Sequence, residues 1–76
     1  MPRYFFNVCS DDAEEIDLVG KRCANDVAAL QEALIKASNV VQKRLFAESF
    51  ISTGSVVVED ETHRCVLSLP LRAAAY

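Results

Sequence analysis

His63 and Cys65 are the two residues whose types and spacing come nearest to a catalytic pair. They stand two positions apart at the start of a predicted strand, so their side chains can share a face and an imidazole there could activate a thiolate. Catalysis also needs oxyanion donors and a pocket, whereas Gly20 and Gly54 are the only glycines and so short a chain leaves little room for a cleft. We therefore expect a turn histidine, a small buried cysteine and no enzymatic activity.

An acidic cluster offers oxygen ligands to a hard cation such as calcium. It comprises Asp11, Asp12, Glu14, Glu15 and Asp17. The cluster lacks the alternating aspartates with a following glycine, and the later glutamate, that make a calcium loop recognisable. We expect it to be a solvated turn.

The three cysteines and the single histidine could formally bind zinc. Cys9, Cys23 and Cys65 lie far apart in the sequence, however, and no two of them have the close spacing of a structural zinc site. An odd number of distant cysteines also argues against a disulfide framework. The sequence therefore predicts neither a metal nor any other cofactor.

The composition is that of one folded domain over residues 1–76, with 51% hydrophobic and 25% charged residues. A chain of this length buries only about 60% of the surface that its unfolded form exposes, so its stability needs help. The formal net charge of -3 removes the broad attraction on which most nucleic-acid binding depends. The N-terminus lacks the long apolar run of a signal peptide, and no segment approaches the roughly 20 apolar residues that span a bilayer. We expect a cytoplasmic protein without a membrane partner.

Hydrophobic periodicity predicts four strands and one helix. The strands alternate or are β-branched, and they cover residues 3–9, 15–19, 55–59 and 65–69. Apolar spacings of three and four predict an amphipathic helix from Val27 to Leu45, capped by Asn25 or Asp26, and residues 71–76 are expected to be a frayed tail. The order β-β-α-β-β predicts a two-layer α+β fold, with the long helix packed on one face of a four-stranded antiparallel or mixed sheet.

The apolar positions of these elements define the expected core. The helix stripe expected to face the sheet consists of Val27, Leu30, Leu34, Ala37, Val41 and Leu45. The sheet positions expected to face that stripe are Tyr4, Phe6, Val8, Val56, Val58, Leu67 and Leu69. The first strand is the most apolar, so we expect it in an inner position of the sheet.

Several short motifs resemble a known family. They are the opening Met-Pro-Arg-Tyr-Phe-Phe, the step Asp17-x-x-Gly20, the helical Ala29-x-x-Glu32-Ala33, and the closing Val58-x-Asp60 and Leu69-Pro70. Together they span nearly the whole chain and resemble a bacterial family of very short proteins described as a domain of unknown function, which implies a fold but no activity. The chain departs from the family pattern at Asn7, where a histidine is common, and at Thr62-His63, where a glycine is common. No role attached to that histidine carries over.

Alternation leaves apolar residues on the sheet face that the helix does not cover. If Tyr4 faces the helix, then Phe5, Val57 and Val66 point away from it, whereas Ile35 and Phe46 lie beside the main helical stripe. Single exposed apolar residues are normal, but a cluster on an open sheet favours a partner, most often a second copy related by a two-fold axis. The sequence thus predicts a non-enzymatic interaction module that forms a homodimer or larger oligomer and buries Phe5, Val57 and Val66.

The alternative function is a small regulator that contacts nucleic acid or a partner protein through the helix. Lys36, Lys43 and Arg44 would form a local basic strip for that contact, and binding through it would depend on salt. The sequence identifies no small-molecule ligand.

Overall fold

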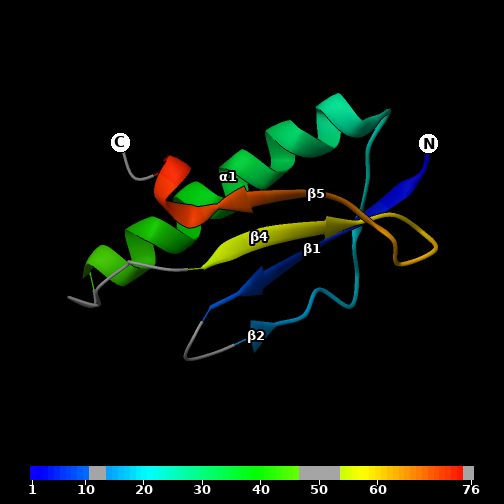
Figure 1. Cartoon of the computed structure of the whole chain (residues 1–76). Helices are drawn as coiled ribbons and strands as arrows, with labels where there is room; N and C mark the ends of the chain where they lie inside the picture. Colours follow the sequence, from blue (N-terminus) through cyan, green and yellow to red (C-terminus); the bar gives the residue numbers. More distant parts are fainter. Residues whose placement is uncertain (11–13, 47–53, 75–76) are drawn as a thin grey trace.

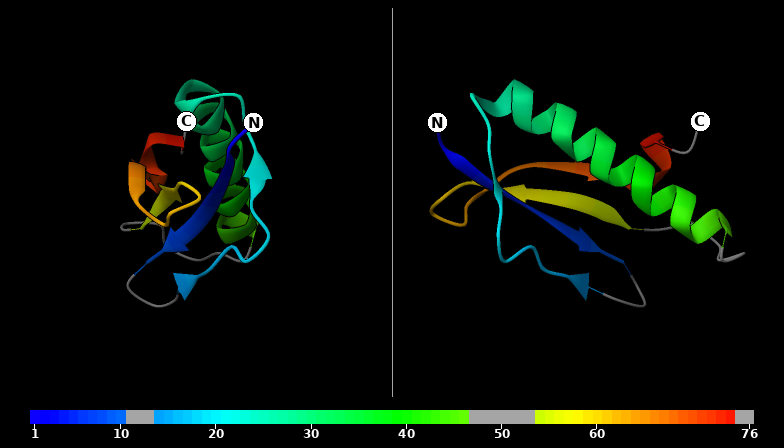
Figure 2. Two further views of the ribbon diagram at one scale, coloured as in Figure 1. Left: turned by 90° about the vertical axis from the view of Figure 1, so that its right-hand side faces the viewer. Right: turned by 180° about the vertical axis from the view of Figure 1, so that it is seen from behind.

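The computed structural model describes residues 1–10, 14–46 and 54–74 (Figure 1). In chain order the elements are β1 (Arg3–Cys9), β2 (Glu14–Glu15), β3 (Lys21–Arg22), α1 (Asp26–Phe46), β4 (Ser55–Glu59), β5 (Cys65–Pro70) and the 3-10 helix η1 (Leu71–Ala74). The helix α1 lies against one face of an antiparallel sheet, which confirms the predicted two-layer α+β fold (Figures 1 and 2).

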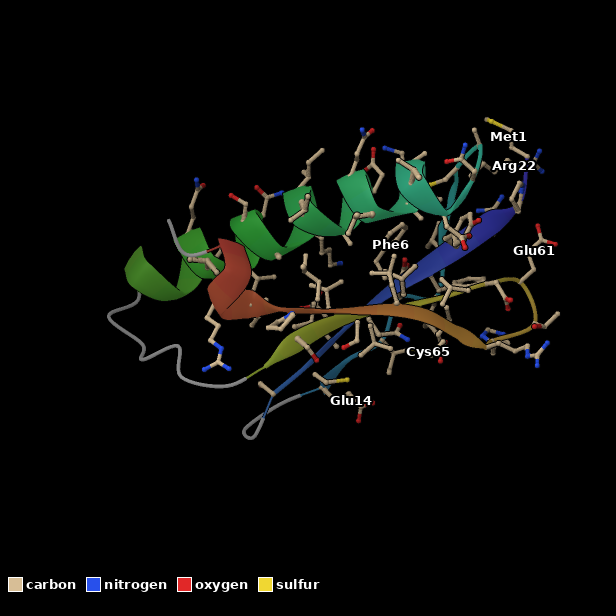
Figure 3. The ribbon with its side chains drawn as sticks, turned by 45° about the horizontal axis from the view of Figure 1, so that its top comes forward. Met1, Phe6, Glu14, Arg22, Glu61 and Cys65 are labelled. Atoms are coloured by element: carbon tan, nitrogen blue, oxygen red, sulfur yellow. The ribbon has the colours of Figure 1, made fainter. Side chains whose placement is uncertain are left out.

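The strand β1 occupies an inner position of the sheet, as predicted. The sheet order is β2-β1-β4-β5, and β3 also pairs with β1. The registers place Phe6 opposite Val58 and Val58 opposite Leu67, so these three form a row across the sheet beneath the helix. Figure 3 shows Phe6 between β1 and α1. The sheet side of the predicted core is confirmed: five of its members are buried and Leu67 and Leu69 pack against them.

The predicted second strand, residues 15–19, is wrong. Instead, two short strands pair with opposite ends of β1: β2 with Val8 and Cys9, and β3 with Arg3 and Tyr4. The chain between β2 and β3 does not pair as a strand, although its alternating sequence favours one. The cause is Asp17. Its side-chain carboxylate accepts the backbone N–H of Phe6 in β1, which the carbonyl of a paired strand would otherwise accept.

Asp17 holds this segment through four hydrogen bonds. Its Oδ2 accepts from the backbone N–H of Phe6 at 3.1 Å, and its Oδ1 accepts from those of Val19 and Gly20 at 3.1 and 3.0 Å. Its own N–H donates to Oδ1 of Asn7 at 2.9 Å. Partial burial raises the pKa of Asp17, but the three backbone N–H donors stabilise the carboxylate more, so the net pKa lies below its ordinary value.

The step from Asp17 to Gly20 requires a glycine at its end. Gly20 has φ +76, and a Cβ there would lie 2.8 Å from the carbonyl oxygen of Tyr4 and 2.9 Å from Cγ of Arg3. Left-handed backbone and close approach to a strand are both tolerated only by glycine at low cost. The Asp17-x-x-Gly20 motif therefore has a structural role at the edge of β1.

The inward face of the helix differs from the predicted stripe. Ala37 and Val41 are buried as expected, but Val27, Leu30 and Leu34 are exposed. The fully buried helical positions are Ala29, Ala33 and Ala37, spaced by four residues. Small side chains face the sheet because Tyr4 and Phe6 already fill the space between the layers, and alanine lets the helix backbone approach them closely. The side chain of Leu45 lies outside the described ones.

The start of α1 is fixed by two side chains. Oδ1 of Asn25 accepts from the backbone N–H of Ala28 at 2.9 Å, which identifies Asn25 as the N-cap that the sequence allowed. Asp26 instead accepts the phenol hydrogen of Tyr4 at 2.7 Å, and this bond raises the pKa of Tyr4 to about 12. The first turn of the helix is thereby attached to β1.

The predicted frayed tail at residues 71–76 is corrected for its first part. Leu71 is fully buried and begins η1, and its N–H donates to the carbonyl of Gly54 at 3.0 Å. Burial of this leucine between α1 and the sheet outweighs the fraying tendency of a chain end. Residues 75–76 lie outside the described ones. Within the described residues, no helix is long and apolar enough to cross a membrane.

Replacing Ala33 by leucine tests the alanine face. Because Ala33 is fully buried against the sheet, the extra methylene groups should overpack the interface and lower the free energy of unfolding by about 1–3 kcal/mol in urea titrations. The control is Lys43→Leu at an exposed position of the same helix, expected to change stability by about 0.5 kcal/mol or less. An Ala33→Leu variant as stable as the control would contradict the packing.

Replacing Asp17 by asparagine tests the carboxylate clamp. At pH 7 the variant should lose about 1–3 kcal/mol, since the amide cannot satisfy all three backbone donors. Because the pKa of Asp17 is lowered in the folded protein, its carboxylate stabilises the fold at any pH above the ordinary aspartate pKa of about 4. This stabilisation is lost as the pH falls through the lowered pKa of the folded protein. The difference between wild type and Asp17→Asn should therefore shrink from pH 7 to pH 3, whereas Glu14→Gln on exposed β2 should show little effect. A constant difference would disprove the clamp.

Candidate interaction surface

The outward face of α1 is exposed and carries no charge between Val27 and Gln42. Six side chains on this face are exposed, namely Val27, Leu30, Gln31, Leu34, Ile35 and Gln42. A seventh, Ser38, is half-buried. Val27 is 65%, Leu34 41% and Ile35 55% exposed. We call these seven residues the outer helix face. A solvent-facing helical surface normally carries charged residues, so this face is unusual for a lone domain.

Two charged residues of the helix, Glu32 and Lys36, lie on one flank, toward β2 and β3. Nζ of Lys21 in β3 lies 2.9 Å from Oε1 of Glu32, and Nζ of Lys36 lies 3.7 Å from Oε1 of Glu15 in β2. These pairs replace the bond between Glu32 and Lys36 that their spacing of four would allow. These pairs attach this flank of the helix to β2 and β3.

The predicted interface on the open sheet face is only partly present. Phe5 is half-buried, with its ring centroid 5.1 Å from that of His63 and the backbone of Gly20 close to its edge. Val57 is also half-buried. Val66 instead packs against the core cluster, because a bulge in the pairing of β4 with β5 interrupts the alternation on which its outward placement was based.

The remaining predicted surface residues lie only partly among the described side chains. Ile35 belongs to the outer helix face, while Phe46 has a side chain outside the described ones, as does Arg44 of the basic strip. Lys43 is exposed, and Lys36 is paired with Glu15. Charge on the strip is thus partly neutralised within the described structure.

His63 and Cys65 make separate contacts. Nδ1 of His63 lies 3.5 Å from Oε1 of Glu59, and its ring stacks on Phe5. The thiol of Cys65 donates to the carbonyl of Leu67 at 3.6 Å, and Cys65 is exposed rather than buried as the sequence predicted. Its position at the irregular start of an edge strand explains this exposure.

The residues considered for metal binding are dispersed. Within the described residues, no three His, Cys, Asp or Glu side chains converge on one point. Cys9 lies opposite Ser55 and Cys65 lies opposite Glu59, with β4 between them, so the sheet separates the two cysteines by roughly 16 Å. Burial is the main cause that raises the pKa of the Cys23 thiol. Asp11 and Asp12 of the acidic cluster lie outside the described residues.

A small cavity of about 230 Å³ lies between α1 and the segment that joins β2 to β3. Phe6 and Ile35 supply apolar walls, and Asp17, Lys21 and Lys36 supply charges. Each of these charges already has a partner: Lys21 bonds Glu32, Lys36 bonds Glu15, and Asp17 bonds the backbone. The cavity therefore shows no preference for a cation or an anion.

A second group of exposed apolar residues stands on the same segment. It consists of Ile16, Leu18 and Val19. Unlike the outer helix face, this group is interrupted by Asp17 and flanked by charged β2 and β3. One signal for the helix face is visible in the sequence: no Asp, Glu, Lys or Arg occurs at the positions that share a face with Val27 and Leu34.

His63 adopts a left-handed backbone conformation, with φ 64, in the turn between β4 and β5. The turn is held by Asp60, whose Oδ1 accepts from the hydroxyl of Thr62 at 2.6 Å and from the N–H of Arg64 at 3.1 Å. These bonds, that from the Thr62 hydroxyl first, lower the pKa of Asp60 below its ordinary value. Left-handed backbone explains why a glycine suits this position.

Comparing His63→Gly with His63→Ala isolates the cost of this backbone conformation. Both variants lose the ring contact with Phe5, but only alanine keeps a Cβ in the left-handed region, so the glycine variant should be more stable by about 1 kcal/mol. Urea unfolding of both variants in the same buffer gives the two values. Equal stability, or a more stable alanine variant, would show that the turn relaxes without cost.

Comparison with known proteins adds a family. No curated protein and no solved structure matches the chain. One family does match, over residues 3–72 of the 76, and its span includes every described strand together with α1 and the start of η1. The chain belongs to the family described as domain of unknown function DUF6894.

Proposed function

We propose that this protein is a small non-enzymatic interaction domain that self-associates, most simply as a dimer, through the outer helix face. The observation that carries the proposal is the exposure of Val27, Leu30, Leu34 and Ile35 on a helical surface without charge. Contiguous exposed apolar surface usually marks a site of interaction. The proposal differs from the sequence-based interface in using the helix instead of the open sheet face.

The placement of charge favours a second copy as the partner. When a surface meets its own copy across a two-fold axis, charges near the axis lie close to their own equivalents and repel them. The outer helix face has no such charge to repel. The chain's net charge of -3 opposes association only at longer range, where salt screens it.

Self-association would also supply stability that the small core lacks. Among the residues whose burial the structure describes, eleven apolar ones form the buried cluster, and three of them are alanines of α1. A partner that binds only the folded state stabilises that state by mass action. The exposed leucines of the helix would then contribute burial that they do not provide within one chain.

We place this activity in the cytoplasm of a bacterial cell. The support is that Cys9, Cys23 and Cys65 are free thiols, as is usual for proteins kept in a reducing compartment. The bacterial origin follows from the family resemblance alone. His63 and Cys65, which contact other groups, give no support to a catalytic role.

Mass measurement tests self-association directly. Sedimentation or light scattering at about 1–100 μM should find the mass of two or more chains, since transient interfaces have affinities in the micromolar range. Ile35→Lys should shift the protein to the monomer by placing a charge on the outer helix face, at its border with the cavity. A wild-type monomer throughout that range would refute the proposal.

Two controls locate the interface. Asn39→Lys adds the same charge at an exposed position of α1 that lies outside the outer helix face, and it should leave the mass unchanged. Val57→Lys adds the charge to the open sheet face and should also leave the mass unchanged while the fold is retained. If Val57→Lys dissociates the assembly and Ile35→Lys does not, the interface is the open sheet face.

A further inference from the structure

We infer that Arg3 and Arg22 form a binding site for a phosphate group on the open sheet face, the face that α1 does not cover. The site is separate from the outer helix face, and it goes beyond the proposed self-association without depending on it. Arg3 begins β1 and Arg22 ends β3, so the site lies at one end of the sheet. Figure 3 shows Arg22 at the end of the molecule where β1 begins.

The register of β1 with β3 places the two arginines side by side. Arg3 lies directly opposite Arg22, and Tyr4 lies opposite Lys21. The second pair faces the helix, because the hydroxyl of Tyr4 bonds the first residue of α1 and Nζ of Lys21 lies 2.9 Å from Oε1 of Glu32. Since successive side chains of a strand point to opposite faces, both arginines point away from the helix.

This pair of like charges is not compensated within the described residues. Like charges at directly opposite positions of two strands repel each other and destabilise the pairing. Among the residues that the structure describes, no carboxylate forms an ion pair with Arg3 or Arg22. Glu61 binds Arg3 at the backbone instead, where its Oε1 accepts the N–H at 2.8 Å. An anion that binds between the two guanidinium groups would replace this repulsion by attraction.

The guanidinium of Arg3 is held on the side of β1 where Arg22 lies. Its Nη1 donates to the carbonyl of Val19, two residues before β3 begins, at 2.8 Å. Gly20 leaves room for this side chain, since a Cβ there would lie 2.9 Å from Cγ of Arg3. The bond uses one of the five N–H groups of the guanidinium, so four remain for a ligand. An arginine that is already held in place loses less conformational entropy when it binds.

The charge and shape of the pair favour phosphate over a carboxylate. A phosphate monoester carries close to two negative charges near pH 7, which match the two guanidinium charges. Each guanidinium presents a planar fork of donors that can bond two oxygens of one phosphate group. A carboxylate has one charge and two oxygens, so it satisfies one fork and leaves the other unmatched. Because the chain has a net charge of -3, binding depends on these local contacts and not on long-range attraction.

An aromatic surface adjoins the arginines on the same sheet face. Phe5 follows Arg3 by two positions, which is about 7 Å along β1, and its ring centroid lies 5.1 Å from that of His63. The side chain of His63 is 67% exposed. A nucleotide whose phosphate is held by the arginines would place its base on this surface, since bases stack on aromatic side chains. Free phosphate would contact the arginines alone.

Titration with inorganic phosphate, followed by ¹H–¹⁵N NMR, tests the site. The signals of Arg3 and Arg22 should shift with a dissociation constant of about 1–10 mM, because exposed charged contacts are weak. Arg22→Gln should weaken binding about tenfold through the loss of one charged contact. Arg22→Lys, which keeps the charge without the planar fork, should lie between the two. The matched control is Arg72→Gln at an exposed position of η1, which should bind as the wild type does.

Three results would overturn the inference. They are shifts that sodium chloride reproduces at the same ionic strength, an affinity of Arg22→Gln equal to that of the wild type, and acetate binding as tight as phosphate binding. Circular dichroism of each variant checks that the fold is retained.

Adenosine monophosphate as a second probe separates the two sources of phosphate. Tighter binding than that of inorganic phosphate, with shifts of the ring signals of Phe5 and His63, would support the site and identify its ligand as a nucleotide. Equal binding with unchanged ring signals would support the site and identify the phosphate group alone as the recognised element.

Discussion

The contact between the alanine face of α1 and the large side chains of the sheet governs how this molecule is arranged. Ala29, Ala33 and Ala37 are fully buried, and they form one buried cluster with residues that include Tyr4 and Phe6 of the sheet. Since volume in a packed interior is limited, large residues on the strand require small ones on the facing helix. The helix must therefore turn its alanines inward, and its leucines then lie at the border of the core or outside it.

The second constraint is that the backbone hydrogen-bonding groups on the outer edge of β1 need partners. The two short strands β2 and β3 cover its ends, and the carboxylate of Asp17 accepts the N–H of Phe6 between them. A buried edge donor without a partner would cost free energy, and one carboxylate satisfies it together with two donors of its own loop. This arrangement also brings Lys21 and Glu15 to the flank of α1, where they pair with Glu32 and Lys36. The charged side of the helix is thus fixed by the edge of the sheet.

The sequence predicts those parts of the fold that depend on local patterns. The β-branched run at residues 55–59 is β4 without change, the inner position of β1 follows from its apolar residues, and Asn25 caps the helix as its side chain allows. Patterns that depend on contacts distant in sequence were not predictable in this way. Alternation at residues 15–19 cannot show that Asp17 will bond Phe6, and it cannot show that a bulge will turn Val66 toward the core.

The choice between two apolar stripes on one helix shows why the candidate site escaped sequence reasoning. The leucine stripe through Leu30 and Leu34 and the alanine stripe through Ala29 and Ala33 both repeat with helical spacing, and hydrophobicity alone favours the leucines as the inward face.

The side-chain volume on the facing strand leaves too little room for the leucines on the inward face. Whether a side chain fits there depends on both packed elements, so the helical sequence alone does not show it. A helix that places its smaller apolar stripe inward leaves the larger one at the border of the core or exposed. In α1 the face that carries this larger stripe has no charge from Val27 to Gln42, and this is the property on which the proposed self-association rests.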